Sequence, residues 1–144
     1  MIVQTVILLI GLAVLAIEDL LFKEIGSIGP FIMGIGGALT SITAGEWNEW
    51  QVILRFIPGI LVLFAAWLTH ETIGYGDGLV ILCLGCFLEL QEMVSVCIMA
   101  VTLAGVVALF LLLIIRKNKK TEIPFIPFLF AGCTILNCMQ GVWM

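Results

Sequence analysis

Long runs of apolar residues, separated by short polar stretches, make up most of the chain. The runs cover residues 2–17, 28–44, 52–69, 79–88, 93–115 and 124–144. A helix needs about 20 apolar residues to cross a bilayer, so most of these runs have the length of a membrane span. The fourth run is short and needs tilt or burial against its neighbours. We therefore predict an all-α fold, a polytopic membrane helix bundle of about six transmembrane helices. The alternative is that the fourth and fifth runs form one continuous helix, which would lower the number of helices by one.

Composition supports a membrane protein and excludes two other classes. The 144 residues are 62% hydrophobic and 11% charged, with a mean hydropathy of +1.27. A disordered chain carries more charge, and a soluble domain has an apolar share of about 45–50%. The first run lacks the basic start and cleavage site of a removable signal peptide, so we take it as a membrane helix. With no repeat or linker visible, we expect one transmembrane domain over residues 1–144, without a separate water-soluble domain.

The distribution of charge predicts an orientation. The polar stretches after the first, third and fifth runs hold five of the six basic residues, Lys23 and those within 116–120. The stretches on the other side hold glutamates, at Glu46, Glu49, Glu89 and Glu92, with Arg55 just inside the third run. Loops rich in basic residues stay in the cytoplasm. We therefore expect the stretches after the first, third and fifth runs on the cytoplasmic side, and both termini outside.

Two aspartates then stand out as candidate catalytic groups. Asp19 follows the first run and Asp77 precedes the fourth, so both are expected at the cytoplasmic side at one depth. Carboxylates close to hydrocarbon are costly and often functional. In a facing pair, one ionised carboxylate takes a proton from water while the other, protonated, activates a peptide carbonyl. The alternative is that each acid only caps a helix end. Glu18 is turned about 100° from Asp19 on a helix and cannot face the same site.

Glycines surround the second aspartate in the sequence Gly74-Tyr75-Gly76-Asp77-Gly78. Glycine allows positive φ angles and the close approach of another backbone. We therefore expect an active-site loop that admits a substrate strand, with a simple flexible turn as the alternative.

Three stretches of the chain resemble the type IV prepilin peptidases, a family of bacterial and archaeal intramembrane aspartic proteases. Residues 74–77 match the family's GxGD motif. After Asp19, residues 23–25 are Lys-Glu-Ile, a basic residue, an acidic residue and an isoleucine at the spacing found in the family. The next two residues are Gly-Ser, where the family usually has Pro-Asn. Residues 123–128, Ile-Pro-Phe-Ile-Pro-Phe, resemble the stretch that opens the family's last core helix. Leu79 stands where the family usually has a lysine.

The resemblance implies an aspartic endopeptidase of the bacterial cytoplasmic membrane, with its active site facing the cytoplasm. Asp19 and Asp77 would be catalytic, and the substrate would be the helix of a prepilin or pseudopilin. The family's methyltransferase domain has no counterpart here, so we expect peptidase activity without methylation. We expect no cofactor, no metal and no nucleic-acid partner. Residues proposed to contact the substrate or to pack between helices are Lys23, Gly34, Gly36, Gly37, Pro124 and Pro127.

Two other signals lead to different interpretations. Cys83 and Cys86 match a CxxC pattern, but a tetrahedral zinc site needs further ligands, so packing explains them better. A small proton- or cation-coupled transporter subunit that uses membrane-end carboxylates is the alternative function. That alternative predicts acids near mid-membrane.

Overall fold

The part of the chain that the structure describes folds into a bundle of six helices. The structure, a computed structural model, describes residues 2–22, 26, 28–45, 49–69, 74–114 and 123–141. These residues form helices and turns and contain no strand. The helices are α1 (Ile2–Phe22), α2 (Ile28–Ala44), α3 (Glu49–Leu68), α4 (Tyr75–Leu84), α5 (Leu90–Ile114) and α6 (Ile126–Met139). The predicted all-α bundle is confirmed.

Three of the helices are long and apolar enough to cross a membrane. They are the segments Ile2–Phe22, Trp50–Leu68 and Leu90–Leu113, whereas α2, α4 and α6 are shorter apolar helices. The outside of the bundle carries many large apolar side chains, including Ile17, Phe31, Trp67 and Phe110. An outer surface of this kind is stable only in an apolar solvent, so the chain is a membrane protein.

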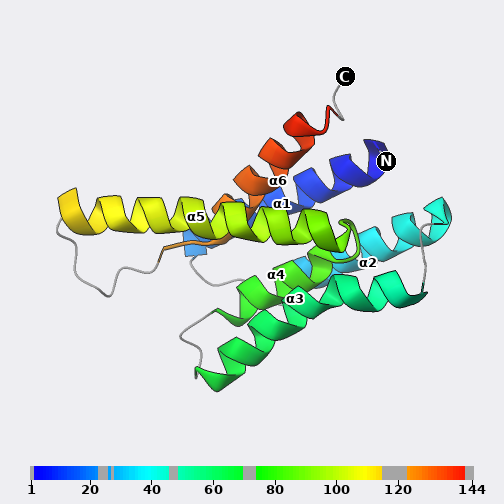
Figure 1. Ribbon diagram of the computed structural model, residues 1–144, viewed down its shortest axis with the longest axis horizontal. Helices are drawn as coiled ribbons and strands as arrows, with labels where there is room; N and C mark the ends of the chain where they lie inside the picture. The colour runs from blue at the N-terminus through cyan, green and yellow to red at the C-terminus, as the bar shows by residue number, and fades with distance from the viewer. Residues whose placement is uncertain are drawn as a thin grey trace.

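Successive helices run up and down through the bundle. Gln4 near the start of α1 donates a hydrogen bond to Ser41 near the end of α2, at 2.9 Å, so these two helices are antiparallel. At the other end, Asp19 of α1 bonds to the first residue of α6. We call that second end the aspartate end and the opposite one the terminal end, because α1 begins and α6 ends there (Figure 1).

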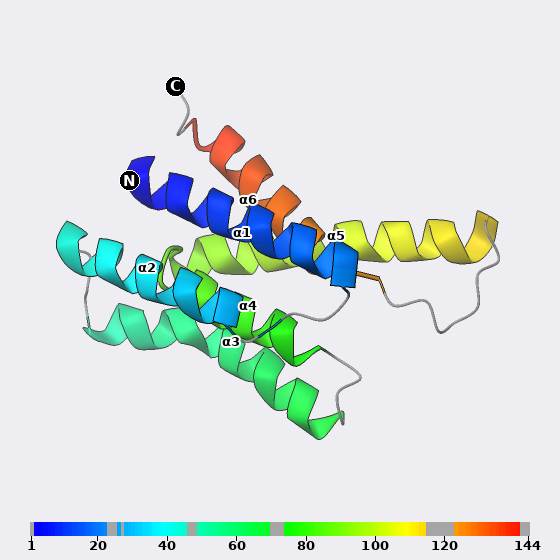
Figure 2. The same cartoon turned by 180° about the vertical axis from the view of Figure 1, so that it is seen from behind.

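The core lies where α1, α4, α5 and α6 meet. Its fully buried side chains include Leu12, Leu84, Met93 and Leu129. On the face seen in Figure 2, α1 and α2 lie side by side, with α4 behind α2. The second half of α5 extends beyond the other helices in both views (Figures 1 and 2). Helix α4 thus occupies the middle of the bundle, held between α2 and α3.

The fourth apolar run differs from its predicted bounds of 79–88. The helix begins at Tyr75 and ends at Leu84, and tighter turns follow, in which Gly85 and Cys86 bond to carbonyls three residues back. At Gly85 a Cβ would lie 2.8 Å from the carbonyl oxygen of Arg55 on α3. This close approach needs a glycine, and the turns separate α4 from α5. The predicted alternative of one fused helix is wrong.

Candidate active site

Asp19 is a buried carboxylate inside the bundle. It lies three residues before the end of α1, and only 5% of its surface is exposed. Its Oδ2 accepts a hydrogen bond of 3.1 Å from the backbone N–H of Ile126. Ile126 is the first residue of α6, whose N-cap residue Phe125 offers no side-chain cap. The first N–H groups of a helix lack partners within it and attract negative charge. Asp19 therefore serves as the cap of another helix, which fixes its carboxylate in place.

Asp77 lies in the first turn of α4 and is partly buried. Its carboxylate lies against Gly74, the N-cap residue, where an added Cβ would be 3.2 Å from Oδ2. An acid in the first turn is favoured by the helix dipole. Gly74 leaves the space that this carboxylate needs.

The fold brings these two aspartates together. They are 58 positions apart in sequence and come from different helices, α1 and α4. The charge of Asp19 nevertheless acts on Asp77, so the carboxylates lie within electrostatic range of each other at the aspartate end. Two carboxylates that interact in this way ionise together less readily than isolated ones. Pairs of this kind can activate a water molecule.

The glycines around Asp77 do not adopt the backbone expected of them. Gly74 has φ −60° and ψ 127°, and Gly76 and Gly78 are part of α4. Among the described residues, positive φ angles occur at Gly45 and Gly141. The expected loop is therefore in large part the first turn of α4, and the positive φ that glycine allows is not adopted at Gly74 or within this helix. Gly78 instead allows close packing, since its Cβ would lie 2.7 Å from Cδ2 of Leu63 on α3.

Several of the other predicted positions lie at the starts of helices. Tyr75 opens α4 and is 40% exposed, so it faces outward beside Asp77. Pro127 lies in the first turn of α6, and Pro124 lies two residues before that helix, close in sequence to the N–H that holds Asp19. Lys23 lies outside the described residues.

The glycines of α2 contact neighbouring helices of the same chain. A Cβ at Gly34 would lie 3.0 Å from Sγ of Cys83, and one at Gly37 would lie 2.5 Å from the ring of Phe87. At Gly36 the nearest atom, on Ile7 of α1, would be at an ordinary 3.7 Å. These residues therefore help α2 pack against α4 and α1.

Glu18 points to a different helix from its neighbour Asp19. A Cβ at Gly29 would lie 3.4 Å from the Oε2 atom of Glu18, so this carboxylate faces the start of α2. Asp19 faces the start of α6. Glu18 is therefore a matched control for any experiment on Asp19.

The cysteines take part in helix packing. Cys83 is buried, and its Sγ donates a hydrogen bond of 3.0 Å to the carbonyl of Pro30 on α2. The Cys86 carbonyl accepts a hydrogen bond from Ser41. In the part of the chain that the structure describes, no group of three or more His, Cys, Asp or Glu side chains lies close enough to hold a metal ion.

Sequence reasoning missed the link between Asp19 and α6. The two prolines of residues 123–128 mark the start of a helix, since proline is favoured in the first turn. Nothing in the sequence relates that helix start to an acid 107 positions earlier.

Comparisons with protein-family models, with curated protein sequences and with solved structures find no match to this chain.

Proposed function

We propose that the chain is an intramembrane aspartic endopeptidase. The observation that carries the proposal is the pairing of Asp19 and Asp77, two acids from separate helices that interact at one end of the bundle. A carboxylate pair close to hydrocarbon is costly and is a candidate functional site for that reason. Asp19 is also held in a fixed position by the Ile126 N–H, as a catalytic group must be.

The pair would hydrolyse a peptide bond as follows. The ionised carboxylate takes a proton from a water molecule, which attacks the carbonyl carbon of the peptide. The protonated carboxylate donates a hydrogen bond to the carbonyl oxygen and stabilises the tetrahedral intermediate. The leaving amine then receives the proton that the first carboxylate took from water. All atoms come from substrate and water, so the reaction needs no further group.

The proposed substrate is a type IV prepilin or pseudopilin, cut between its short charged leader and its hydrophobic helix. This class follows from the resemblance of residues 19–25, 74–77 and 123–128 to the prepilin peptidases. Gly74 and Tyr75 are exposed next to Asp77, where an extended leader could approach. The hydrophobic helix of the substrate would lie in the bilayer beside the apolar outer surface of the bundle.

The location follows from the placement of charge. Five of the six basic residues of the chain follow α1 or α5 in the sequence, and both of these helices run towards the aspartate end. Under the positive-inside rule, that end faces the cytoplasm of a bacterial cytoplasmic membrane. Prepilin leaders are presented on that side, so the proposed orientation and the proposed substrate agree.

The test is cleavage of a prepilin-like substrate by purified protein, followed by electrophoresis of the shortened product. We expect Asp19→Asn and Asp77→Asn each to lower the rate by about 10²–10⁴-fold, because each removes one proton-transfer group at nearly constant shape. Glu18→Gln is the control and should cleave at the original rate, because Glu18 faces α2.

Full cleavage by either aspartate variant would contradict the mechanism. Absence of cleavage by the unmodified protein, together with proton or cation flux in vesicles that depends on both aspartates, would favour the transporter alternative.

A further inference from the structure

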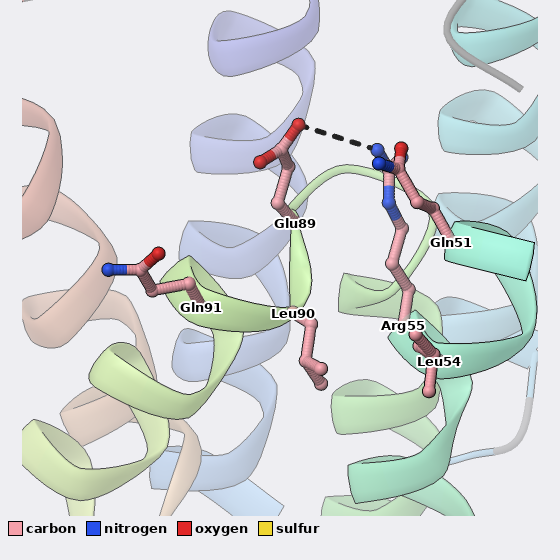
Figure 3. A pocket seen from close by; sticks show the side chains of 6 residues that line it. All are labelled: Gln51, Leu54, Arg55, Glu89, Leu90 and Gln91. Carbon is pink, nitrogen blue, oxygen red and sulfur yellow. Dashed lines mark ion pairs between the residues drawn. The ribbon is translucent and has the colours of Figure 1, made fainter. Parts of the chain in front are cut away.

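A second polar site lies at the terminal end of the bundle, away from the aspartates. It is a cavity of about 230 Å³ between the first turns of α3 and the start of α5. Six side chains line it, as Figure 3 shows: Gln51, Leu54, Arg55, Glu89, Leu90 and Gln91. The proposed peptidase activity uses none of them, so the site requires its own explanation.

Two opposite charges lie next to each other in the lining of this cavity. Arg55 is buried, with 8% of its side chain exposed, whereas 71% of the Glu89 side chain is exposed. The Nη2 atom of Arg55 lies 3.6 Å from Oε1 of Glu89 (Figure 3). That separation is an ion pair but is longer than a hydrogen bond. A guanidinium carries five N–H donors, and Glu89 is its one ionic partner among the described residues. The lining therefore presents a buried cation and an exposed anion side by side, and a ligand that carries both charges matches this arrangement.

The cavity lies beside a residue type that is common at the membrane–water boundary. Trp50, one residue before Gln51, is 77% exposed, and tryptophans are enriched at the membrane–water boundary. In Figure 3 the polar ends of Glu89, Arg55 and Gln51 lie together, while the side chains of Leu54 and Leu90 extend in the opposite direction. The site is thus polar on one side and apolar on the other.

Apolar surface continues from the cavity along both helices. Helices α3 and α5 begin at the cavity and diverge as they run towards the aspartate end (Figure 1). Their next turns expose apolar side chains, Ile57 on α3 and Val94 and Ile98 on α5. A headgroup in the cavity would therefore place its acyl chains against apolar side chains of α3 and α5.

We propose that this cavity binds a phospholipid with a phosphoethanolamine headgroup. Its phosphate accepts hydrogen bonds from the planar Arg55 guanidinium, whose parallel N–H groups can bind two phosphate oxygens. Its ammonium group donates to the Glu89 carboxylate. An anionic glycerol headgroup offers no cation of its own to Glu89, and a choline headgroup has no N–H to donate. The site therefore selects the zwitterionic headgroup that can donate hydrogen bonds, and it does so independently of the peptidase.

The test is native mass spectrometry of the purified protein with equal amounts of phosphatidylethanolamine, phosphatidylcholine and phosphatidylglycerol that share the same acyl chains. We expect phosphatidylethanolamine to be retained about tenfold over phosphatidylglycerol, the effect of one charge-assisted hydrogen bond. Glu89→Gln should remove most of that preference, because the amide no longer attracts the ammonium group.

Glu92→Gln is the matched control. Glu92 lies one turn from Glu89 and accepts hydrogen bonds from the Glu89 N–H and from Gln140, yet it does not line the cavity. A glutamine there keeps an acceptor oxygen, so the lipid preference should stay. Arg55→Gln should lower retention of all three lipids. Arg55 is buried, so its replacement can disturb folding. The lipid preference of Glu89→Gln is therefore the decisive measurement.

Three results would overturn the proposal. One is equal retention of phosphatidylethanolamine and phosphatidylglycerol by the unmodified protein. Another is an unchanged preference in Glu89→Gln. The third comes from a separate arm with free phosphoethanolamine: if it displaces the lipid at equal concentration, the site takes a soluble phosphate compound and not a lipid.

Discussion

The contact between α3 and α4 makes Gly59 the most sensitive glycine for a test of the packing that positions Asp77. A Cβ at this position would lie 2.4 Å from the Cα of Leu82 and 2.7 Å from its backbone nitrogen. Carbon atoms pack at about 3.5–4.0 Å, so the methyl group of alanine falls about 1 Å or more short of contact distance. The obstructing atoms belong to backbone and cannot rotate away. In Gly59→Ala the two helices must therefore separate.

The expected cost is about 1–3 kcal/mol of stability, the usual range for an overfilled core. Because α4 also carries Asp77, the shift alters its distance from Asp19, and an error of about 1 Å in a catalytic geometry can cost about 10²-fold in rate. The measurements are the thermal denaturation midpoint of the protein in detergent and the cleavage rate of a prepilin-like substrate.

Gly105→Ala is the matched control, since a Cβ at Gly105 in α5 would meet nothing within 4 Å. Its thermal denaturation midpoint should stay unchanged or rise slightly, because alanine has a better helix propensity than glycine. An unchanged midpoint in Gly59→Ala would refute the close packing of α3 on α4. An equal loss in both variants would show that glycine in a span matters for another reason.

Two further predictions concern helix packing and orientation. Gly37→Ala should destabilise the fold by about 1–2 kcal/mol, because its Cβ would lie 2.5 Å from the Phe87 ring. Adding Phe87→Leu should recover part of that loss, whereas additive effects in the denaturation midpoints would exclude the contact. In membrane vesicles, a maleimide that cannot cross the bilayer should label Tyr75→Cys from the cytoplasmic side and Trp50→Cys from the outer side, above the signal of the native cysteines. The reverse pattern would contradict the proposed orientation.

The number of helices could be predicted from the sequence because each apolar run ends at a clear polar or glycine-rich break. Their bounds could not be predicted as well. Residues 85–88 are as apolar as the helix before them, yet they form turns, and hydropathy does not distinguish the two. The helix also starts earlier than expected, since Gly76 and Gly78 are helical. The small size of Gly78 serves packing against α3, and only the tertiary structure shows that need.

The site could be predicted in part. The two aspartates were identified by their expected depth and by the glycines near Asp77, and the structure brings them within electrostatic range. The partner of Asp19 could not be found, because it is a backbone N–H and carries no side-chain signature. The cavity at Arg55 could not be predicted from the sequence either. It needs Glu89 next to Arg55, and the turns that bring Glu89 there have no signature in the sequence.

The hydrogen bond between Asp19 and Ile126 also bears on biosynthesis. Asp19 leaves the ribosome with the first helix, and its backbone partner is made 107 residues later, at the start of α6. A nascent chain that has inserted α1 to α5 therefore has both aspartates but lacks the donor that fixes one of them. Contacts this distant in sequence form late in assembly. The carboxylate pair reaches its final geometry only when the sixth helix has entered the bundle.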